Sequence, residues 1–398
     1  MSFADVKFQD VAVRMLRAAV AHDRLPHALI FAGPRGVGKG LVARELAKLV
    51  FCQSPLRQAQ GGPQSGGPEA CGTCTHCVRV ARGTHPDLHW FRKEPDRNDF
   101  RLRLVTDREG GPEETVLSSV SLKPMEARHS VTVLDDAEFL NTEAANALLK
   151  CLEEPAPTAL LILLCADASS LPGTVLSRCQ WVPFRPLPEE FVAAKLAEIL
   201  KATASRPAAG RRGGKEEPLP SVSGDEAAFV CRFAGGSIEQ AVSLAGNGLW
   251  PLKRELVERL PHVDEAMAFE MAALIKKWAE GRAKADRETS ESREETALRR
   301  AAFRTALAAV VTALRDALVA KAGAAEGVPI TNRDQLKTVE SLAAWPEDAL
   351  VRGIGLLVSA QAEITRYVHT ELATENAFVQ MGRLVGVQGT RKNALAAR

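Results

Sequence analysis

The chain has 398 residues, of which 46% are hydrophobic and 25% are charged, and its formal net charge is +2. This length exceeds what one hydrophobic core usually supports, so we expect two or three domains. The balanced charge argues against autonomous nucleic-acid binding, and no run of about 18 uncharged apolar residues predicts a membrane span. No charged-then-apolar leader opens the sequence, so we expect a cytoplasmic protein.

The N-terminal part predicts a helix, a strand and a second helix. Residues 1–25 show helical spacing, and the apolar run 28–32 predicts a buried strand. The loop Gly33-Pro-Arg-Gly-Val-Gly-Lys-Gly40 follows, and a helix through residue 50 comes after it. This order is the context of a P-loop, in which Lys39 reaches the outer phosphates of a nucleotide. Backbone N–H groups can close around a phosphate at the glycines of the loop, Gly33, Gly36 and Gly38.

The loop departs from the P-loop motif at one position. The motif has Ser or Thr after the lysine, because that hydroxyl coordinates Mg²⁺, whereas this chain has Gly40. The sequence therefore predicts a P-loop fold and leaves two alternatives open for its chemistry. Either the loop binds ATP with Mg²⁺, or it keeps only its shape.

The eight cysteines of the chain fall into two groups. Four lie in apolar segments and are expected to be packed thiols: Cys151, Cys165, Cys179 and Cys231. The other four suit a closed, tetrahedral, structural zinc site: Cys52, Cys71, Cys74 and Cys77. An iron–sulfur cluster is the rival, but its motif places the fourth cysteine shortly downstream, whereas here that cysteine lies upstream. His76 is a weaker candidate ligand, and four unliganded cysteines are the remaining alternative.

A parallel strand–helix–strand unit is predicted further along the chain. Two apolar runs, 131–134 and 160–165, flank a segment whose apolar residues recur at helical spacing. Asn141 or Thr142 can cap the start of this helix, and Pro155 ends it. A short apolar strand on each side of a crossover helix is typical of a parallel sheet that is buried on both faces.

Charged residues follow both of these strands. Asp135 and Asp136 come at the carboxyl end of the first strand, which is the edge of a parallel sheet where phosphates and magnesium are handled. After the second strand, a helical turn carries Ser177-Arg178-Cys179 and directs a cation outward.

Shorter predicted elements are strands over 87–91 and 181–184 and a helix over 113–122. Prolines from 183 to 188 mark a domain boundary, and residues 202–224 read as a low-complexity, solvated insertion. We expect three domains: an α/β P-loop domain with a parallel sheet over 1–184, including a four-cysteine module at about 52–77, an all-α lid over 185–248, and an all-α domain over 249–398.

At this point the chain resembles a known family, the AAA+ clamp-loader subunits of bacterial DNA polymerase III. The motifs that carry the resemblance occur in order over residues 24–179: RLPHALIFAGPRGVGKG, the four-cysteine cluster, DDAEFLNTEAANALLKCLEEP and LPGTVLSRC. The resemblance implies an AAA+ domain with a zinc module, a helical lid, and a helical collar that assembles a five-subunit ring with tau/gamma and delta subunits. It also implies that this ring uses ATP to load a sliding clamp onto primed DNA.

Two kinds of subunit share these landmarks, the motor tau/gamma and the stator-like delta prime. A hydrolysing subunit has four groups that this chain replaces. Gly40 occupies the position of the magnesium-binding hydroxyl, and Asp136 that of a glutamate base. Cys165 or Ala166 occupies the position of a polar residue that positions water, and Glu239 that of the lid arginine of the motor subunit. Each loss lowers turnover by about tenfold to a thousandfold. We therefore expect little or no independent ATPase activity.

Arg178 is retained. The resemblance implies that this arginine reaches the nucleotide of a neighbouring subunit, where such a finger is worth about 10³–10⁵ in rate. The alternative is a structural ion pair that holds the end of the strand. A chain that keeps the trans-acting cation without its own catalytic set fits the delta prime role. The rivals are an active motor subunit and an unrelated AAA+ repair or helicase subunit, which the near-neutral charge disfavours.

Overall fold

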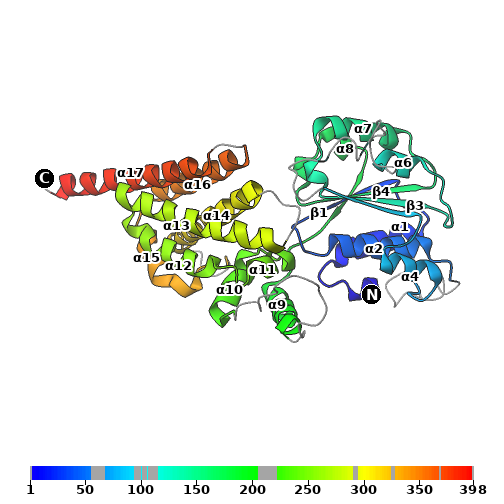
Figure 1. The fold of residues 1–398 in the computed structure, drawn as a ribbon, viewed down its shortest axis with the longest axis horizontal. Coiled ribbons are helices and arrows are strands. Elements are labelled where there is room, and N and C mark those ends of the chain that lie inside the picture. The colour runs from blue at the N-terminus through cyan, green and yellow to red at the C-terminus, as the bar shows by residue number, and fades with distance from the viewer. Residues whose placement is uncertain are drawn as a thin grey trace. The chain divides into compact units, whose positions relative to one another are not determined.

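The computed structural model forms two compact units, shown as a ribbon in Figure 1. The first unit is Met1–Pro188 with Gly235–Glu239, and the second is Glu189–Ala234 with Gln240–Arg398. The expected lid, residues 185–248, therefore contributes to both units, and most of the expected insertion at 202–224 lies outside the described residues. The structure describes residues 2–54, 68–93, 100, 105, 115–204, 222–289, 295–323, 328–366 and 369–396.

The first unit contains a parallel five-stranded sheet, as the sequence predicts. The strand order is β2-β3-β4-β1-β5, and each neighbouring pair is parallel. The strands are β1 Ala28–Ala32, β2 Leu88–Arg92, β3 Ser130–Asp135, β4 Ala159–Cys165 and β5 Gln180–Pro183. Every residue of β1 and β4 is buried, because helices cover both faces of the sheet.

Two groups of helices cover the sheet (Figure 1). One face is covered by α1 Asp10–Ala21, α2 Lys39–Phe51 and α4 Thr75–Arg82, and the other by α6 Val116–Ser121, α7 Thr142–Glu153 and α8 Gly173–Leu176. Short 3₁₀ helices lie at Phe3–Asp5, Ala137–Phe139 and Ala168–Ser170. Side chains of alternate strand residues, such as Ile30 and Leu163, form one core cluster with Leu148 of α7.

Helix α7 begins and ends as its sequence predicts. The Asn141 side-chain oxygen accepts the backbone N–H of Ala144 at 2.8 Å, so Asn141 is the cap and Thr142 is the first helical residue. The helix ends at Glu153, shortly before Pro155. The helix predicted over 113–122 is shorter, because α6 begins at Val116 after a Thr115 cap.

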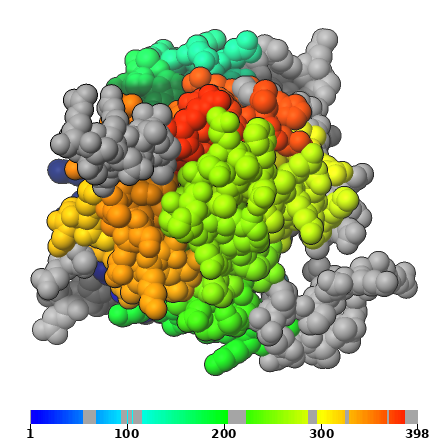
Figure 2. Space-filling model, turned by 90° about the vertical axis from the view of Figure 1, so that its left-hand side faces the viewer, coloured from blue at the N-terminus to red at the C-terminus, as the bar shows by residue number. Residues whose placement is uncertain are grey.

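The described residues of the second unit form helices and the loops that connect them. Its long helices pack around α14, whose Phe303, Leu307 and Val310 are fully buried. In the space-filling view of Figure 2, α13 lies in yellow-green beside segments of α17 in red. The helices are α9 Glu189–Ala204, α10 Gly224–Phe233, α11 Ile238–Leu244, which starts in the first unit, α12 Leu249–Arg259, α13 Glu265–Thr289, α14 Glu295–Lys321, α15 Leu336–Ala343, α16 Glu347–Thr365 and α17 Thr370–Ala396. Short 3₁₀ helices lie at Leu260–His262 and Arg333–Gln335.

Within the described part of the chain, no helix combines the length and the apolar character that crossing a membrane requires.

Candidate functional site

The loop between β1 and α2 has the backbone of a P-loop. Gly36 and Gly38 have φ angles of 69° and 101°, a region that favours glycine. A Cβ atom at Gly33 would collide with the backbone of Phe184, and one at Gly36 would lie 2.7 Å from the backbone nitrogen of Glu239. Glycine is therefore required at both of these positions by close approach of other segments.

Lys39 is held inside its own loop. Its Nζ donates to the carbonyl oxygens of Gly33 at 2.5 Å and Pro34 at 2.7 Å. The side chain is buried, and this burial lowers the pKa of the Lys39 ammonium. A phosphate would have to replace these two carbonyl oxygens as the partner of the ammonium.

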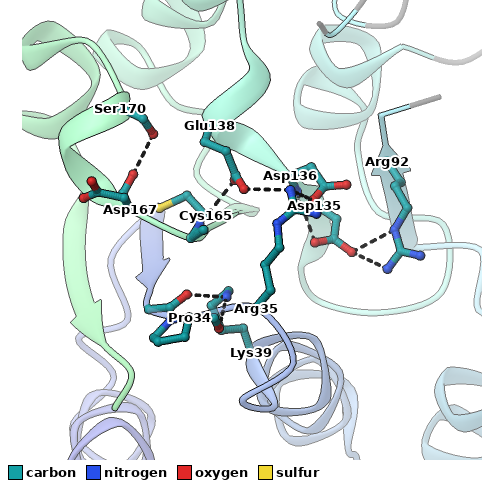
Figure 3. A network of polar contacts seen from close by, with 12 residues as sticks. Pro34, Arg35, Lys39, Arg92, Asp135, Asp136, Glu138, Cys165, Asp167 and Ser170 are labelled. Carbon is teal, nitrogen blue, oxygen red and sulfur yellow. Dashed lines mark hydrogen bonds and ion pairs between the residues drawn. The ribbon is translucent and has the colours of Figure 1, made fainter. Parts of the chain in front are cut away.

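The two aspartates at the end of β3 are each paired with an arginine (Figure 3). The Arg92 Nε and Nη2 atoms donate to Asp135 Oδ2 at 3.0 and 2.6 Å. Arg35, in the middle of the P-loop, lies with its Nη2 atom 2.7 Å from Asp136 Oδ1. Burial is the largest contribution that raises the pKa of Asp136, and Arg35 opposes it.

Glu138 completes this network, and sequence reasoning did not single it out. Its Oε1 atom accepts the Arg35 Nη2–H at 2.9 Å, and its Oε2 atom accepts the backbone N–H of Ala166 at 3.3 Å. Glu138 therefore joins the P-loop to the end of β4 (Figure 3). Burial by itself would lower the pKa of Arg35, but its carboxylate neighbours outweigh burial and raise that pKa.

The remaining predicted positions of this site are uncharged or acidic. Cys165 is buried at the end of β4, and burial raises the pKa of its thiol to about 12, so the group is neutral at pH 7. Glu239 approaches Gly36 closely, and its charge contributes to the raised pKa of Arg35. The structure thus brings the four replaced positions, Gly40, Asp136, Cys165 and Glu239, around one loop. None of these four residues supplies a positive charge or a hydroxyl group there.

The four predicted cysteine ligands come together in the first unit. Cys52 follows α2, Cys71 lies in the next described loop, Cys74 caps α4, and Cys77 lies in its first turn. Their sulfur atoms all lie within 4.8 Å of one another, with Cys71 and Cys77 at 4.0 Å. A tetrahedron of sulfurs about 2.3 Å from zinc has edges of about 3.8 Å. The cluster therefore has the composition and dimensions to hold a metal ion such as zinc.

Hydrogen bonds already favour a thiolate at one of these positions. The backbone N–H of Cys74 points to Cys71 Sγ at 3.3 Å. Burial alone would raise the pKa of Cys71, but N–H donors from Cys74 and Thr73 outweigh it and lower the pKa to about 6. Burial raises the pKa of Cys77 and of Cys52. A bound cation would compensate the cost of ionising these buried thiols.

His76, the weaker candidate ligand, contacts another histidine. Its Nδ1 atom lies 2.8 Å from Nε2 of His85, and the His85 ring stacks on Phe51. His85 Nδ1 accepts the backbone N–H of Asp87 at 3.1 Å. The proton of a neutral His85 is therefore on Nε2 and is donated to His76, so His76 supports the module from outside the sulfur cluster.

Arg178 lies at a surface corner after α8. Its Nη2 atom is 2.7 Å from Glu153 Oε1, and the side chain of Arg178 is 36% exposed. Its Nη1 atom donates to the Thr174 carbonyl oxygen at 3.0 Å and to Ser177 Oγ at 3.3 Å. The ion pair considered as an alternative is thus present, and it leaves about a third of the Arg178 side chain exposed.

Comparison with known proteins adds an independent finding. Residues 8–188 match the family model described as DNA polymerase III, delta subunit. The Bacillus subtilis DNA polymerase III subunit delta' is 31% identical over 192 residues, which cover 48% of this chain and 52% of that protein. The Pseudomonas aeruginosa delta' subunit is 32% identical over 235 residues, covering 59% of this chain and 64% of that protein.

A tau/gamma subunit is similar to the same extent. The Haemophilus influenzae tau/gamma subunit is 33% identical over 199 residues, covering 50% of this chain and 26% of that protein. A DNA polymerase III gamma subunit-related protein from Thermotoga maritima has a TM-score of 0.36 at 13% identity, covering 94% of this chain and 99% of that chain. This chain spans about half of the length of the Bacillus subtilis delta' subunit.

The sheet order, the P-loop after β1 and the acidic end of β3 define an AAA+-like P-loop domain followed by a helical region. The matches cover the N-terminal half of the chain, and this half is similar to the DNA polymerase III clamp-loader family of delta' and tau/gamma subunits. Identities of 31–33% to both kinds of subunit do not distinguish between them.

Proposed function

We propose that this chain acts as a delta'-type subunit of the clamp loader. It hydrolyses little or no ATP, and it supplies Arg178 to the nucleotide bound by a neighbouring subunit. One contrast carries the proposal: Lys39 and Asp136 of its own P-loop site are held by contacts within that site, whereas Arg178 lies outside it, 36% exposed at the corner after α8.

The geometry of the P-loop site supports the first half of the proposal. Gly40 has no hydroxyl for Mg²⁺, and Asp136, where a base would activate water, faces Arg35 at 2.7 Å. Burial raises the pKa of Asp136, but its Oδ1 atom is occupied by Arg35 and is not free to take a proton from water. The P-loop residues Gly33, Gly36, Gly38 and Lys39 keep the shape of a phosphate site, so nucleotide binding without turnover remains compatible with this proposal.

The chemistry of arginine supports the second half. A guanidinium has five N–H donors, and the described contacts of Arg178 involve its Nη1 and Nη2 atoms. Placed against a phosphoryl group in transfer, it would neutralise the negative charge that develops on the equatorial oxygens. The acting group is then on this chain while the nucleotide is on its neighbour.

The cysteine cluster has a structural role in this proposal. Cys52, Cys71, Cys74 and Cys77 would hold zinc with four thiolates and leave no open coordination position. Such an ion joins the end of α2 to the start of α4 and catalyses nothing. The rest of the assembly follows from the family: tau/gamma and delta neighbours in a five-subunit ring, and contact with the sliding clamp and primed DNA through that ring.

The decisive experiment uses a complex reconstituted with tau/gamma and delta subunits. The R178A variant should lower clamp- and DNA-stimulated ATPase by at least about tenfold, because a finger of this kind is worth about 10³–10⁵ at a single site. Assembly, followed by size-exclusion chromatography, should be unchanged. R185A removes another exposed arginine nearby in the sequence and should retain full activity. Unchanged turnover with R178A would contradict the proposed role.

The competing function is an active motor subunit, which the equal identity to tau/gamma favours. That hypothesis predicts ATP turnover by the isolated chain and its loss in K39A. The delta'-type proposal predicts turnover at background level in both.

A further inference from the structure

Glu153 is placed where its charge does not help its own helix. It is the last residue of α7, and Glu154 follows it as the C-cap. The C-terminal end of a helix carries partial negative charge, so a carboxylate there is destabilising. Glu153 is 51% exposed, and its described ion pair is the one to Arg178 at 2.7 Å. The compensating partner of this carboxylate is therefore the candidate finger itself.

The remaining contacts of Arg178 come from its own segment. The Thr174 carbonyl oxygen and Ser177 Oγ accept from Nη1, whereas Glu153 faces Nη2. Two neutral acceptors thus fix one edge of the guanidinium to α8 and its C-cap. The carboxylate occupies the other amino group, which could equally face an oxygen of an incoming phosphoryl group.

A phosphoryl oxygen and the Glu153 carboxylate are both negatively charged, and they compete for the same N–H donors on Nη2 of Arg178. A half-exposed ion pair is weak, because water competes for both partners and the side chains lose rotamer freedom. A nucleotide held rigidly by a neighbouring subunit brings several negative oxygens and can displace such a partner. The exchange needs a change at Nη2 only, while the Nη1 contacts to Thr174 and Ser177 stay.

We infer that Glu153 is the positioning residue of Arg178: it holds the guanidinium at the α8 corner until a phosphoryl oxygen on the neighbouring subunit's nucleotide replaces the carboxylate. This inference rests on the proposed trans role of Arg178. When the ring assembles with nucleotide, the phosphoryl oxygen takes the place of the Glu153 carboxylate at Nη2 of Arg178. Glu153 consequently weakens nucleotide binding at the shared site and does not contribute to the chemical step.

Kinetics of the reconstituted complex test this exchange. E153Q removes the competing charge and keeps the size of the side chain, so KM for ATP should fall by up to about fivefold, the range of an exposed pair. The kcat value should stay within about twofold, because binding before and during the chemical step improves equally. E154Q, which neutralises the adjacent exposed carboxylate, should leave both constants unchanged. The KM difference should shrink in high salt, which screens exposed pairs.

A second measurement needs only the isolated full-length chain. Phenylglyoxal reacts with accessible guanidinium groups, and mass spectrometry of chymotryptic peptides follows Arg178 specifically. Release from the carboxylate should speed modification of Arg178 in E153Q by up to about fivefold relative to wild type and E154Q. Circular dichroism confirms that each variant is folded.

The outcomes separate this inference from the proposed function. If R178A leaves ATPase unchanged, the proposed trans role is wrong. If R178A is defective but E153Q has the same KM as E154Q, or a lower kcat, the exchange is wrong and the trans role stands. Equal modification rates of Arg178 in all variants would also overturn the exchange.

Discussion

Asp87 is a buried carboxylate that fixes the chain ahead of β3. It is 2% exposed, and it accepts backbone N–H groups from Met125 at 2.5 Å, Glu126 at 3.0 Å and Ala127 at 2.7 Å. Burial alone would raise the pKa of Asp87, but these three donors outweigh it and hold the pKa below its usual value. The loop from α6 to β3 is thereby anchored, and β3 carries Asp135 to the candidate nucleotide site.

Asparagine at this position should cost stability in a pH-dependent way. Hydrogen bonds to a charged group contribute about 1.5–3 kcal/mol, so D87N should lower the free energy of unfolding by roughly 2–3 kcal/mol at pH 7. Because the pKa of Asp87 is lower in the folded state, its contribution is fully present above the unfolded value of about 3.9 and is lost as pH falls through the folded pKa. Urea unfolding of both proteins between pH 7 and 3 measures this difference. A difference that does not depend on pH would contradict the explanation.

Residue identities in the site could be predicted where a motif fixes them. Glycines of the P-loop, Lys39 and the aspartates after β3 follow from local pattern. Arg92 does not, because it meets Asp135 only through the pairing of β2 with β3, in which these two residues are in register. Glu138 reaches Arg35 and Ala166 because a 3₁₀ helix turns it back over the sheet edge. Both contacts depend on strand order, which the sequence does not display.

At the scale of elements, short apolar runs predicted all five strands to within one residue at each end. The signal is clearest for β1 and β4, in which every residue is buried, because a parallel strand covered on both faces is a continuous apolar run. Helix α4 is not among the elements that the sequence predicts, because its first half coincides with the cysteine motif. Cys74 is the N-cap of this helix, and the buried helical residues Cys77 and Val80 lie three positions apart. The three-residue spacing of the cysteines thus coincides with the three-residue spacing of buried positions on the helix, and the sequence does not separate the two.

Metal analysis tests the predicted link between α2 and α4. We expect about one zinc per chain, and C71S should abolish stoichiometric binding because three thiolates remain. Loss of the ion should lower the melting temperature of the first unit by at least about 5 °C, since metal-binding energy contributes to folding energy. C151S, which changes a thiol outside the cluster, should retain the zinc and most of the stability. A wild-type chain free of metal after purification without chelators would contradict the zinc proposal.

At the scale of the whole chain, the helical unit shows the limits of local pattern most clearly. Lys253 has the sequence appearance of a solvated residue, yet it is fully buried. Its Nζ atom lies 2.7 Å from Asp334 and within 5 Å of the centres of the Phe229 and Trp250 rings. Burial lowers the pKa of Lys253, and Asp334 opposes this shift. Only the tertiary fold brings this carboxylate, 81 residues away in sequence, to the lysine.

Helix α16 has apolar residues on two faces. Leu350 and Leu357 are fully buried against the helical core, but Val351 and Val358 are 54% and 49% exposed. The two valines are seven residues apart, about two helical turns, so they lie on the same outer face. They form a short apolar strip on a face that otherwise exposes small and polar residues. This face is where the proposed collar would contact another subunit of the ring.

Charge on that face should therefore weaken assembly without unfolding the chain. V351E and V358E each place a carboxylate in a contact that excludes water, so each should weaken association with tau/gamma and delta subunits by at least about tenfold, equivalent to about 1.4 kcal/mol. S359E adds the same charge to a neighbouring exposed position on a different face of α16, and it should associate like wild type. Analytical ultracentrifugation gives the dissociation constants, and circular dichroism checks that the helices remain folded. If V351E and V358E assemble as tightly as S359E, the outer face of α16 does not take part in the ring.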